Sequence, residues 1–494
     1  MYQNGNSIEF STEATAFNDR SGGILQNLVA NSSVKVGDAI LFNNLDKEYP
    51  NVAIANVGAK GVSMDKNELM DIGKENIRRA IGKAVVLLQN EGSTKIFTDG
   101  MTSPESVAEA ATLASWKFEG TKSTKNQSPP ATVEPFNQDD RNLFDQGAVF
   151  GGAQNLARMF TEIPANILTP SVFADNMTKT LCPCGITVDI QDKDWIEAKK
   201  LYGVLEASKG SCEQPLFAVL GYCGGDKTQK PLAFVGHATT HDTGGICLRK
   251  CSDQVNKKQH LASGAALVGM MKGIAQLSLP INVYAYIPLF ENATSGTAMH
   301  VSDVFTALNG VSINVDDTKY ASRLAMADTL VYASLTRPQT LINVNTLSGA
   351  THRVFGEFAT PLFTTSKTLS QEFQRAGATT GDRVWLLPSY DRKRKMVTSD
   401  PLADMSVVGE GGSTIDDIAK NAAFGKEFVA LDSDIEYAHL DIGGVTINTD
   451  TITYPYLREE FATGRLTRTL IQMVYQRVCP HNPPPTSEFN KQRN

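Results

Sequence analysis

Short apolar runs alternate with longer amphipathic stretches through most of the chain, and this alternation limits the possible folds more than any other feature. In the first 120 residues, β-branched runs occupy 34–42, 51–58 and 95–100, and helical patterns occupy 75–89 and 103–118. Alternating strand and helix signals are typical of a sheet with helices packed on it. The sequence therefore predicts a smaller N-terminal α/β domain.

The same alternation continues over a longer stretch towards the carboxyl end. The run 231–237 is almost entirely apolar, as expected for a central strand covered on both faces. The stretch 261–277 has one apolar face, which is typical of a helix that covers a sheet. We expect a larger C-terminal domain with a mainly parallel, helix-covered sheet, whose strands are 186–192, 216–222, 231–237, 281–288 and 340–346.

A polar stretch with three prolines at 121–140 predicts a surface loop. The next stretch, 141–164, has helical periodicity and ends at a proline, so it predicts a long connecting helix. We place the N-terminal domain at 1–150 and the C-terminal domain at 151–480. The proline-rich remainder, 481–494, has no periodicity and is expected to be disordered.

The composition is that of an ordinary globular protein and excludes several classes. The 494 residues suit two or three domains, and 41% hydrophobic residues argue against a disordered chain. The balance of 46 Lys and Arg against 53 Asp and Glu gives a net charge of −7, spread along the chain. This pattern predicts no nucleic-acid partner. The longest apolar runs, such as 279–290, are too short to span a bilayer.

The cysteines and the first residues bear on location. Seven cysteines without zinc-ribbon spacing favour a reducing compartment. The first twenty residues contain more acidic than basic side chains, unlike a signal peptide or an Arg-rich transit peptide. We expect the cytoplasm or the mitochondrial matrix, with no visible targeting segment; a presequence already removed would leave no trace.

Several separate segments carry a family resemblance in their order and spacing. The main segments are 235-VGHATTHDTGGICLR-249, 309-NGVSINVDDTKYASRLAMADTLVYA-333 and 341-LINVNTLSGA-350, with support from 155-NLARMFTEIPANILTP-170, 290-FENATSGTA-298, 403-ADM-405 and 439-HLDIGG-444. With these segments in this order and spacing, the chain resembles the leucyl aminopeptidase family, peptidase family M17.

The resemblance implies a fold, an assembly and a chemistry. Members of this family hydrolyse amino-terminal residues with two divalent metals, zinc or manganese, bound by one lysine amine and four carboxylates. Two adjacent cations activate a water and polarise the peptide carbonyl. The resemblance also implies a homohexamer built as a dimer of trimers.

The five metal-ligand positions of the family are mostly changed in this chain. They fall on His237, which replaces the lysine, on the retained Asp242, and on Leu261, Lys319 and Ala321. Leucine and alanine have no ligand atom, and a lysine ammonium repels a cation. Two potential ligands do not hold a dinuclear site, so we expect no bound metal.

Two further family positions carry positive charge. The family's active-site lysine falls on Arg249, followed by Lys250, and the family's arginine is matched by Arg323. Arginine does not simply replace lysine as a compact point charge, so both positions are expected to be inactive. We expect Asp242 and Lys319 to pair where the metals would lie, and Arg323 to lie near the turn at 345–350.

Other polar residues have weaker functional interpretations. A mononuclear zinc site is geometrically possible for His237, His241 and Asp242, because residues at an even offset on a strand share a face. Hydrogen bonding inside an altered pocket is the favoured alternative. The run 392–395 is expected to be a solvated basic loop. Helix caps or solvated side chains are expected at Asp303, Asp316, Asp317, Asp404 and Asp441.

The leading hypothesis is a catalytically inactive leucyl aminopeptidase homologue, a pseudoenzyme with a structural or scaffolding role in a homo-oligomer. Its pattern of ligand loss resembles the leucyl aminopeptidase-like proteins enriched in insect sperm mitochondria. One alternative is a metal-dependent aminopeptidase with an altered site. Another is a binding module that holds a peptide N-terminus or a small anion through Arg249 and Arg323. Higher-order assembly, or a hexamer shared with active paralogues, is a further possibility.

Overall fold

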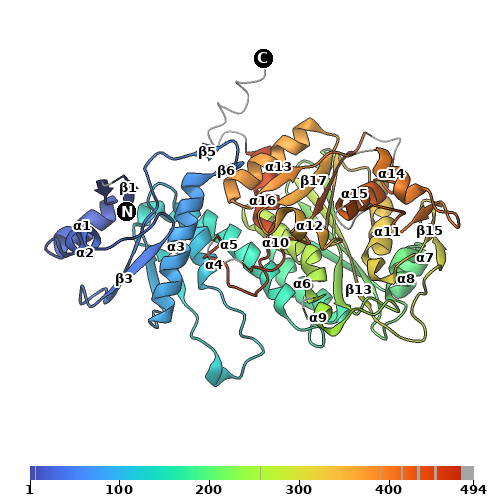
Figure 1. Cartoon of the computed structure of the whole chain (residues 1–494), viewed down its shortest axis with the longest axis horizontal. Helices are drawn as coiled ribbons and strands as arrows, with labels where there is room; N and C mark the ends of the chain where they lie inside the picture. The colour runs from blue at the N-terminus through green and yellow to red at the C-terminus, as the bar shows by residue number, and fades with distance from the viewer. Residues whose placement is uncertain are drawn as a thin grey trace, which may run out of the picture.

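The structure is a computed structural model of the chain. It describes residues 1–5, 7–255, 257–389, 391–412, 416–430, 434–449 and 453–479. Two α/β domains lie side by side along the longest axis, with the smaller N-terminal domain on the left and the larger domain on the right (Figure 1). The expected disordered tail at 481–494 lies outside the described residues. None of the helices within the described ranges is long and apolar enough to cross a membrane.

The N-terminal domain is built from two-stranded sheets packed against two long helices. Strands β3 (Ala39–Asn43) and β4 (Asn51–Ala55) are antiparallel, and helices α3 (Ile72–Asn90) and α4 (Pro104–Ser115) pack against each other. The side chain of Asp71 caps α3, and Pro104 starts α4 with a backbone angle that suits a first turn. The smaller elements are β1 (Tyr2–Asn4), β2 (Ser7–Glu9), α1 (Thr12–Arg20), α2 (Ile24–Ala30), β5 (Met64–Asp65) and β6 (Met70–Asp71).

The expected surface loop at 121–140 contains a strand, so that prediction was wrong in part. Strand β8 (Thr132–Pro135) pairs in parallel with β7 (Lys95–Thr98). Of the three prolines that suggested a loop, Pro135 is the last residue of β8, where a missing amide does not interrupt the ladder. Two short helical turns flank the strand, η1 (Thr124–Asn126) and η2 (Gln138–Asp140).

The C-terminal domain contains a nine-stranded mixed sheet in the described residues. The path is β18-β17-β20-β16-β11-β13-β10-β9, with β12 paired to β13. The four central strands β20, β16, β11 and β13 are parallel, as predicted for a buried sheet. The strand bounds are β9 (Thr187–Gln191), β10 (Leu216–Cys223), β11 (Leu232–Val235), β12 (Ala238–Asp242), β13 (Asn282–Asn292), β16 (Thr340–Asn345), β17 (Thr360–Thr364), β18 (Val384–Leu386) and β20 (Glu436–Asp441).

Helices cover both faces of this sheet, as Figure 1 shows. Successive side chains of a strand point to opposite faces, so Phe234 and Ile342 join one core while Ala233 and Leu341 join the other. One face is covered by α5 (Arg141–Glu162), α6 (Pro170–Leu181), α10 (Ala262–Gln276), α13 (Lys367–Thr380) and α16 (Thr467–Val478). The other is covered by α7 (Lys193–Ala198), α8 (Tyr202–Ser208), α11 (Ala321–Leu335) and α15 (Asp417–Lys426).

Helix α5 confirms the long helix predicted at 141–164, and α10 confirms the one predicted at 261–277. The basic run 392–395 was expected to be a loop, and that prediction was wrong. It lies within the mostly exposed helix α14. The remaining elements are η3 (Cys182–Cys184), α9 (Cys251–Gln254), η4 (Lys257–Leu261), β14 (Val304–Thr306), β15 (Ser312–Asn314), η5 (Thr318–Tyr320), α12 (Ala350–Phe355), α14 (Asp391–Thr398) and β19 (Met405–Ser406).

Residues from the far end of the chain complete the core of the N-terminal domain. Tyr454, Tyr456 and Leu457 pack among the apolar side chains of α3 and α4. Gly82 of α3 allows the close approach, because a Cβ there would lie 2.6 Å from the Cβ of Tyr456. The C-terminal end of the chain therefore contributes to the core of the N-terminal domain.

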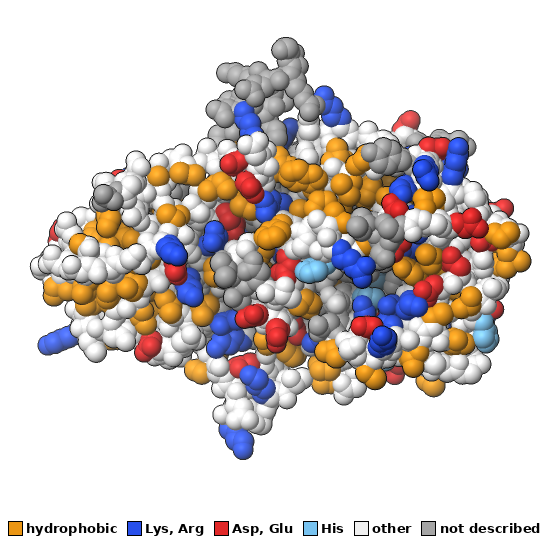
Figure 2. Space-filling view, in the orientation of Figure 1, with side chains coloured by type: hydrophobic (Ala, Val, Ile, Leu, Met, Phe, Trp, Pro, Cys, Tyr) orange, Lys and Arg blue, Asp and Glu red, His pale blue; other side chains and the backbone are white. Residues whose placement is uncertain are grey.

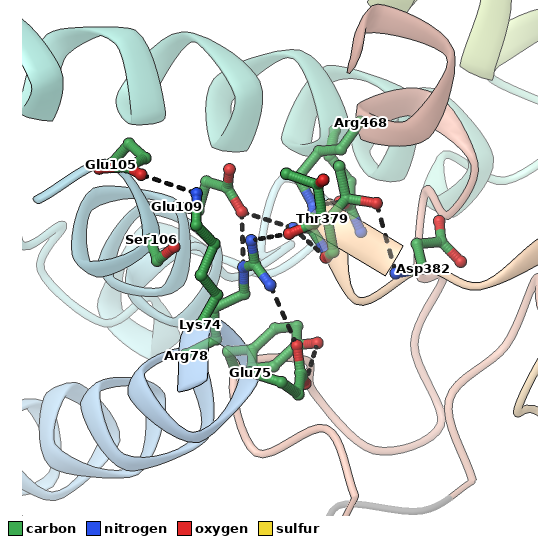
Figure 3. A network of polar contacts seen from close by, with 12 residues as sticks. Lys74, Glu75, Arg78, Glu105, Ser106, Glu109, Thr379, Asp382 and Arg468 are labelled. Atoms are coloured by element: carbon green, nitrogen blue, oxygen red, sulfur yellow. Dashed lines mark hydrogen bonds and ion pairs between the residues drawn. The ribbon is translucent and has the colours of Figure 1, made fainter. Parts of the chain in front are cut away.

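A buried ionic network also joins the two domains (Figure 3). Glu109 of α4 accepts hydrogen bonds from Arg78 of α3 at 2.7 Å and from Arg468 of α16 at 2.6 Å. Arg78 also donates to the carbonyl of Thr379 at the end of α13 and to Glu75 of its own helix. Removing one partner would leave buried charge uncompensated, so the network holds the domains in one arrangement.

Candidate functional site

The candidate site lies where the central parallel strands of the large sheet end. Side chains that follow the carboxyl ends of such strands meet at one edge, which is the usual position of ligand sites in sheets of this kind. His237 follows β11, Thr346 follows β16, and Asp441 ends β20. Asp242 ends the neighbouring strand β12.

His237 is fully buried and hydrogen-bonded through both ring nitrogens. Its Nδ1 lies 3.1 Å from Thr239 Oγ1, and its Nε2 lies 3.2 Å from Thr346 Oγ1. Burial lowers the pKa of His237 to about 3, so the ring is neutral at pH 7. Each ring nitrogen therefore already has a protein partner.

Asp242 accepts four hydrogen bonds, two on each carboxylate oxygen. Oδ1 accepts from the backbone amide of Gly244 at 2.8 Å and from Asn292 Nδ2 at 2.9 Å. Oδ2 accepts from Arg249 Nη2 at 2.9 Å and from His260 Nδ1 at 2.7 Å. Burial alone would raise the pKa of Asp242, but these donors hold it well below its ordinary range. The carboxylate is ionised and its lone pairs are occupied.

Lys319 does not pair with Asp242, so that prediction was wrong. Its Nζ lies 2.9 Å from Asp317 Oδ2, and its backbone amide donates to the Oδ1 of the same Asp317. Asp317 caps the short helical turn η5, and this turn brings the Lys319 side chain back onto Asp317. Arg249 is the residue that pairs with Asp242 instead, because its Nη2 donates both to Asp242 and to the Lys319 carbonyl at 2.9 Å.

Two other family ligand positions are part of the hydrophobic core. Leu261 ends η4 and is fully buried against the apolar side chains on one face of the sheet. Ala321 begins α11 and is 1% exposed in the core on the other face. Neither side chain offers an atom that can bind a metal.

The five positions do not fit the pair of metal ions that the family resemblance implies. Within the described ranges there is no group of three or more His, Cys, Asp or Glu side chains placed to hold a metal ion. The residues do not fit a mononuclear zinc site either. Asp242 pairs with His260 and Arg249, and both ring nitrogens of His237 contact threonines. Asp242 and His237 are instead satisfied by protein groups.

Arg323 is fully buried beside this cluster. Its guanidinium stacks on the Tyr320 ring with 4.0 Å to the centroid, and Nη1 donates to the Val407 carbonyl. Its Nε and Nη2 have no hydrogen-bond partner in the described part of the chain. Arg323 and residues 346–350 line the same cavity, which confirms the expected proximity of Arg323 to the turn at 345–350.

Asp441 is fully buried at the end of β20. It was expected to be solvated or to cap a helix, so that prediction was wrong. Its Oδ1 accepts from the backbone amides of Leu347 and Gly443, and its Oδ2 accepts from Asn421 Nδ2. Burial raises the pKa of Asp441 to about 7. The available signal was its position directly after the apolar strand residues of β20.

The residues that form hydrogen bonds with Asp242 and His237 were not predicted from the sequence. His260 and Asn292 contact Asp242, and Thr346 contacts His237. They come from three separate segments, so no local spacing joins them. His260 had one usable signal, since it directly precedes Leu261, a position expected to lie in the site.

A cavity of about 220 Å³ opens beside this cluster and is predominantly basic. Asp417 is the one carboxylate among its described lining residues, and it is paired with Lys420 at 3.1 Å. Figure 2 shows several Lys and Arg side chains on the half of the molecule that carries α12 and α15. The basic lining residues are Arg249, Lys257, His260, Lys319, Arg323 and Arg353.

Comparison with known proteins matches both domains to one family. The model of the cytosol aminopeptidase family catalytic domain matches residues 155–471, and the model of that family's N-terminal domain matches 5–125. The chain is 34% identical to a cytosol aminopeptidase of Xenopus tropicalis over 477 residues, which is 95% of this chain and 89% of that protein. It is 34% identical to human cytosol aminopeptidase over 449 residues, which is 90% of this chain and 85% of that protein.

Solved structures share the fold at lower sequence identity. The bottromycin maturation enzyme BotP in complex with Mn has a TM-score of 0.80 and 24% identity, covering 96% of this chain and 97% of that one. A mutant of tomato leucine aminopeptidase has a TM-score of 0.80 and 21% identity, covering 96% of this chain and 91% of that one. Both support the two-domain architecture.

Proposed function

Because this chain belongs to the cytosol aminopeptidase family, M17, we propose that it is a catalytically inactive member that keeps the family framework without metal-dependent hydrolysis. One observation carries this proposal. Asp242, the family carboxylate ligand that the chain retains, has both oxygens occupied by protein donors.

The arrangement opposes metal binding energetically as well as geometrically. A cation at Asp242 would have to displace the Arg249 guanidinium and would then lie close to its positive charge. Two of the positions that should complete the ligand set are the buried Leu261 and Ala321. Hard divalent cations need several oxygen or nitrogen ligands, and these positions offer none.

The proposed role is structural, as a scaffold in a homo-oligomer. The buried cores and the interdomain network are those of a fully packed protein, which supports retention of the fold apart from the chemistry. We infer assembly as a homohexamer, a dimer of trimers. A hexamer shared with active paralogues and a place in the structural material of sperm mitochondria are alternatives that this proposal includes. Relatives named cytosol aminopeptidase support a cytosolic location, with the mitochondrial matrix as the alternative.

Metal analysis combined with an activity assay tests the proposal. The purified chain is dialysed after incubation with manganese or zinc, its metal content is measured, and hydrolysis of a leucine anilide is followed with manganese present. We expect less than one tenth of an equivalent of metal per chain and no turnover. Two retained equivalents, together with turnover that His237→Ala abolishes, would instead establish an aminopeptidase with an altered site.

A second candidate function is binding of a small anion, and the basic cavity favours it. The same cavity argues against a peptide N-terminus. An ammonium group would face five Lys and Arg side chains, and the one lining carboxylate among the described residues is already paired.

A further inference from the structure

A separate cavity lies inside the N-terminal domain, between two pairs of strands that belong to different sheets. Strands β3 and β4 form one sheet, and β7 and β8 form another. The cavity is lined by residues of β4, β7, α3 and α1 and has a volume of about 190 Å³. Packed protein interiors contain few voids larger than a water molecule, so a space of this size is unusual in a small domain.

The wall of this cavity is predominantly apolar. An apolar cavity of roughly 150 Å³ stays dry and binds a ring of the size of benzene, so this one has room for an aromatic ring with a short chain. The larger aliphatic side chains on the wall are Leu25, Val52, Ile54, Ile81, Val85 and Leu88.

Aromatic side chains mark the solvent-facing rim of the cavity. Phe97 is 39% exposed and Phe136 is 48% exposed. The Tyr49 ring contacts both edge-on, with centroid distances of 6.2 and 6.0 Å. Arg20 lies over the Tyr49 ring at 5.3 Å, and Lys95 lies over the Phe97 ring at 4.8 Å. Because the face of an aromatic ring attracts positive charge, this rim favours cations.

Two carboxylates that line the cavity accept hydrogen bonds only from neutral donors within the described residues. Asp99 accepts from the Ser11 hydroxyl and from the Met101 amide. Glu13 accepts from Asn137 Nδ2 at 3.4 Å. Neither carboxylate has a Lys, Arg or His side chain within ion-pair distance in that part of the chain. Their negative charge is therefore not compensated by a neighbouring side chain.

The nearest basic side chains pair with other carboxylates. Arg20 lies 3.3 Å from both Asp46 and Glu48. Lys95 lies 3.7 Å from Glu134. Both cations are thus balanced by their own partners at the rim, and they leave the carboxylates of the cavity unpaired.

The Met1 amine also lines the cavity but adds little positive charge. It donates to the Ala55 carbonyl at 2.7 Å, and burial lowers its pKa to about 6, so it is mostly neutral at pH 7. Burial and the charges of Asp99 and Asp139 raise the pKa of the nearby Asp140. The end of the cavity at Asp99 therefore carries excess negative charge.

We propose that this cavity is a binding site for a small arylalkyl amine, a single aromatic ring joined by a short chain to an ammonium group. The ring occupies the apolar interior, and the ammonium group pairs with Asp99 and Glu13 beside the Tyr49 ring. This cavity shares no lining residue with the basic cavity of the large domain. The inference therefore does not depend on whether the chain binds metal.

Thermal-shift and calorimetric titrations of the full chain at constant ionic strength test the proposal. The probes are 2-phenylethylamine, 3-phenylpropionate and ethylamine, which separate the contribution of the ring from that of the charge. We expect 2-phenylethylamine to raise the Tm with concentration and to bind at least tenfold tighter than the other two. Equal, weak effects of all three probes, or tighter binding of 3-phenylpropionate, would overturn the proposal.

Charge-removing variants locate the ammonium group. Asp99→Asn and Glu13→Gln keep the size of each side chain, and each is expected to weaken binding of 2-phenylethylamine at least fivefold. The matched control is Asp145→Asn, which removes an exposed carboxylate paired with Arg141 on α5 and should leave the affinity unchanged. Equal loss in all three variants would indicate general attraction of a cation to an acidic protein and would reject the site.

A cavity-filling variant locates the ring independently of charge. Ala84 of α3 is buried and lines the cavity, so Ala84→Leu extends into the empty space. We expect this variant to keep or raise the Tm of the ligand-free chain and to bind 2-phenylethylamine at least tenfold more weakly. Unchanged affinity in the folded variant would place the amine elsewhere and would overturn the proposal.

Discussion

Asp242 and Arg249 form an ion pair of 2.9 Å at the edge of the large sheet, beside the carboxyl ends of its central strands. The Asp242 side chain is 2% exposed and that of Arg249 is 15% exposed, so the pair is largely removed from water. A fixed guanidinium thus supplies the positive charge that the retained carboxylate requires. The site is altered at several positions that compensate one another.

Removing the charge of Asp242 should destabilise the protein. Asp242→Asn leaves Arg249 without its counterion. Where the Asp242 Oδ2 accepts a hydrogen bond from His260, the asparagine amide nitrogen would place a second donor against the His260 donor. We expect the free energy of unfolding to fall by about 2–3 kcal/mol, measured by urea denaturation. Asp317→Asn is the control, because its partner Lys319 is 35% exposed, and it should cost less than about 1 kcal/mol. Similar small losses in both variants would contradict a stabilising role of the Asp242 cluster.

Restoring one carboxylate at a core position should be strongly unfavourable. Leu261→Asp places an unpaired carboxyl group in the apolar core, and we expect a loss of roughly 3–5 kcal/mol in the free energy of unfolding. Leu261→Met keeps the volume and should cost less than about 1.5 kcal/mol. An aspartate variant as stable as the methionine variant would show that this position already accommodates charge.

Asp441 should make stability depend on pH. Its pKa is about 7 in the folded protein and about 3.9 in the unfolded chain, so the folded state holds an extra proton between these values. Its contribution to the free energy of unfolding therefore decreases as pH rises from about 4 to 7, by up to about 1.4 kcal/mol per pH unit.

Asp441→Asn should remove this dependence. The asparagine Oδ1 can keep both backbone amide bonds, and its Nδ2 can donate to Asn421 Oδ1, which has no partner among the described residues. Urea denaturation from pH 5 to 8 should show the variant gaining stability relative to the parent as pH rises to 7, with no further gain above it. A difference independent of pH would contradict the raised pKa.

The interdomain network should be sensitive to the loss of its shared carboxylate. Glu109→Gln leaves the buried Arg78 and Arg468 without a counterion between them, and we expect a loss of about 3–5 kcal/mol in the free energy of unfolding. Glu134→Gln breaks an exposed contact of 3.7 Å with Lys95 and should change stability by about 0.5 kcal/mol or less. Equal effects would show that Glu109 does not join the domains.

The sequence predicted most of the fold because its strongest signals are local. The run 231–237 indicated a central strand, and β11 lies there between two parallel neighbours. The runs 51–58 and 95–100 likewise contain β4 and β7. The strand within 121–140 was missed, since its four residues depend on pairing with β7, which lies 37 residues earlier in the chain, rather than on their own pattern.

The candidate site was predictable in position but not in its contacts. The resemblance located His237, Asp242, Leu261, Lys319 and Ala321, yet the partner chosen for Asp242 was wrong. That choice depends on how η5 turns Lys319 towards Asp317 and on the reach of Arg249, and both are tertiary features. The absence of metal and the inactive role stay predictions.

The packing of Tyr454, Tyr456 and Leu457 into the N-terminal domain has a consequence for biosynthesis. A ribosome completes α3 and α4 long before it reaches these residues, although domains generally fold in the order in which they are made. A nascent chain halted before Tyr454 would carry its first domain with part of the apolar interior open to the cytosol. Chaperones would bind that exposed apolar surface. The surface would be buried only when roughly the last tenth of the chain has been translated.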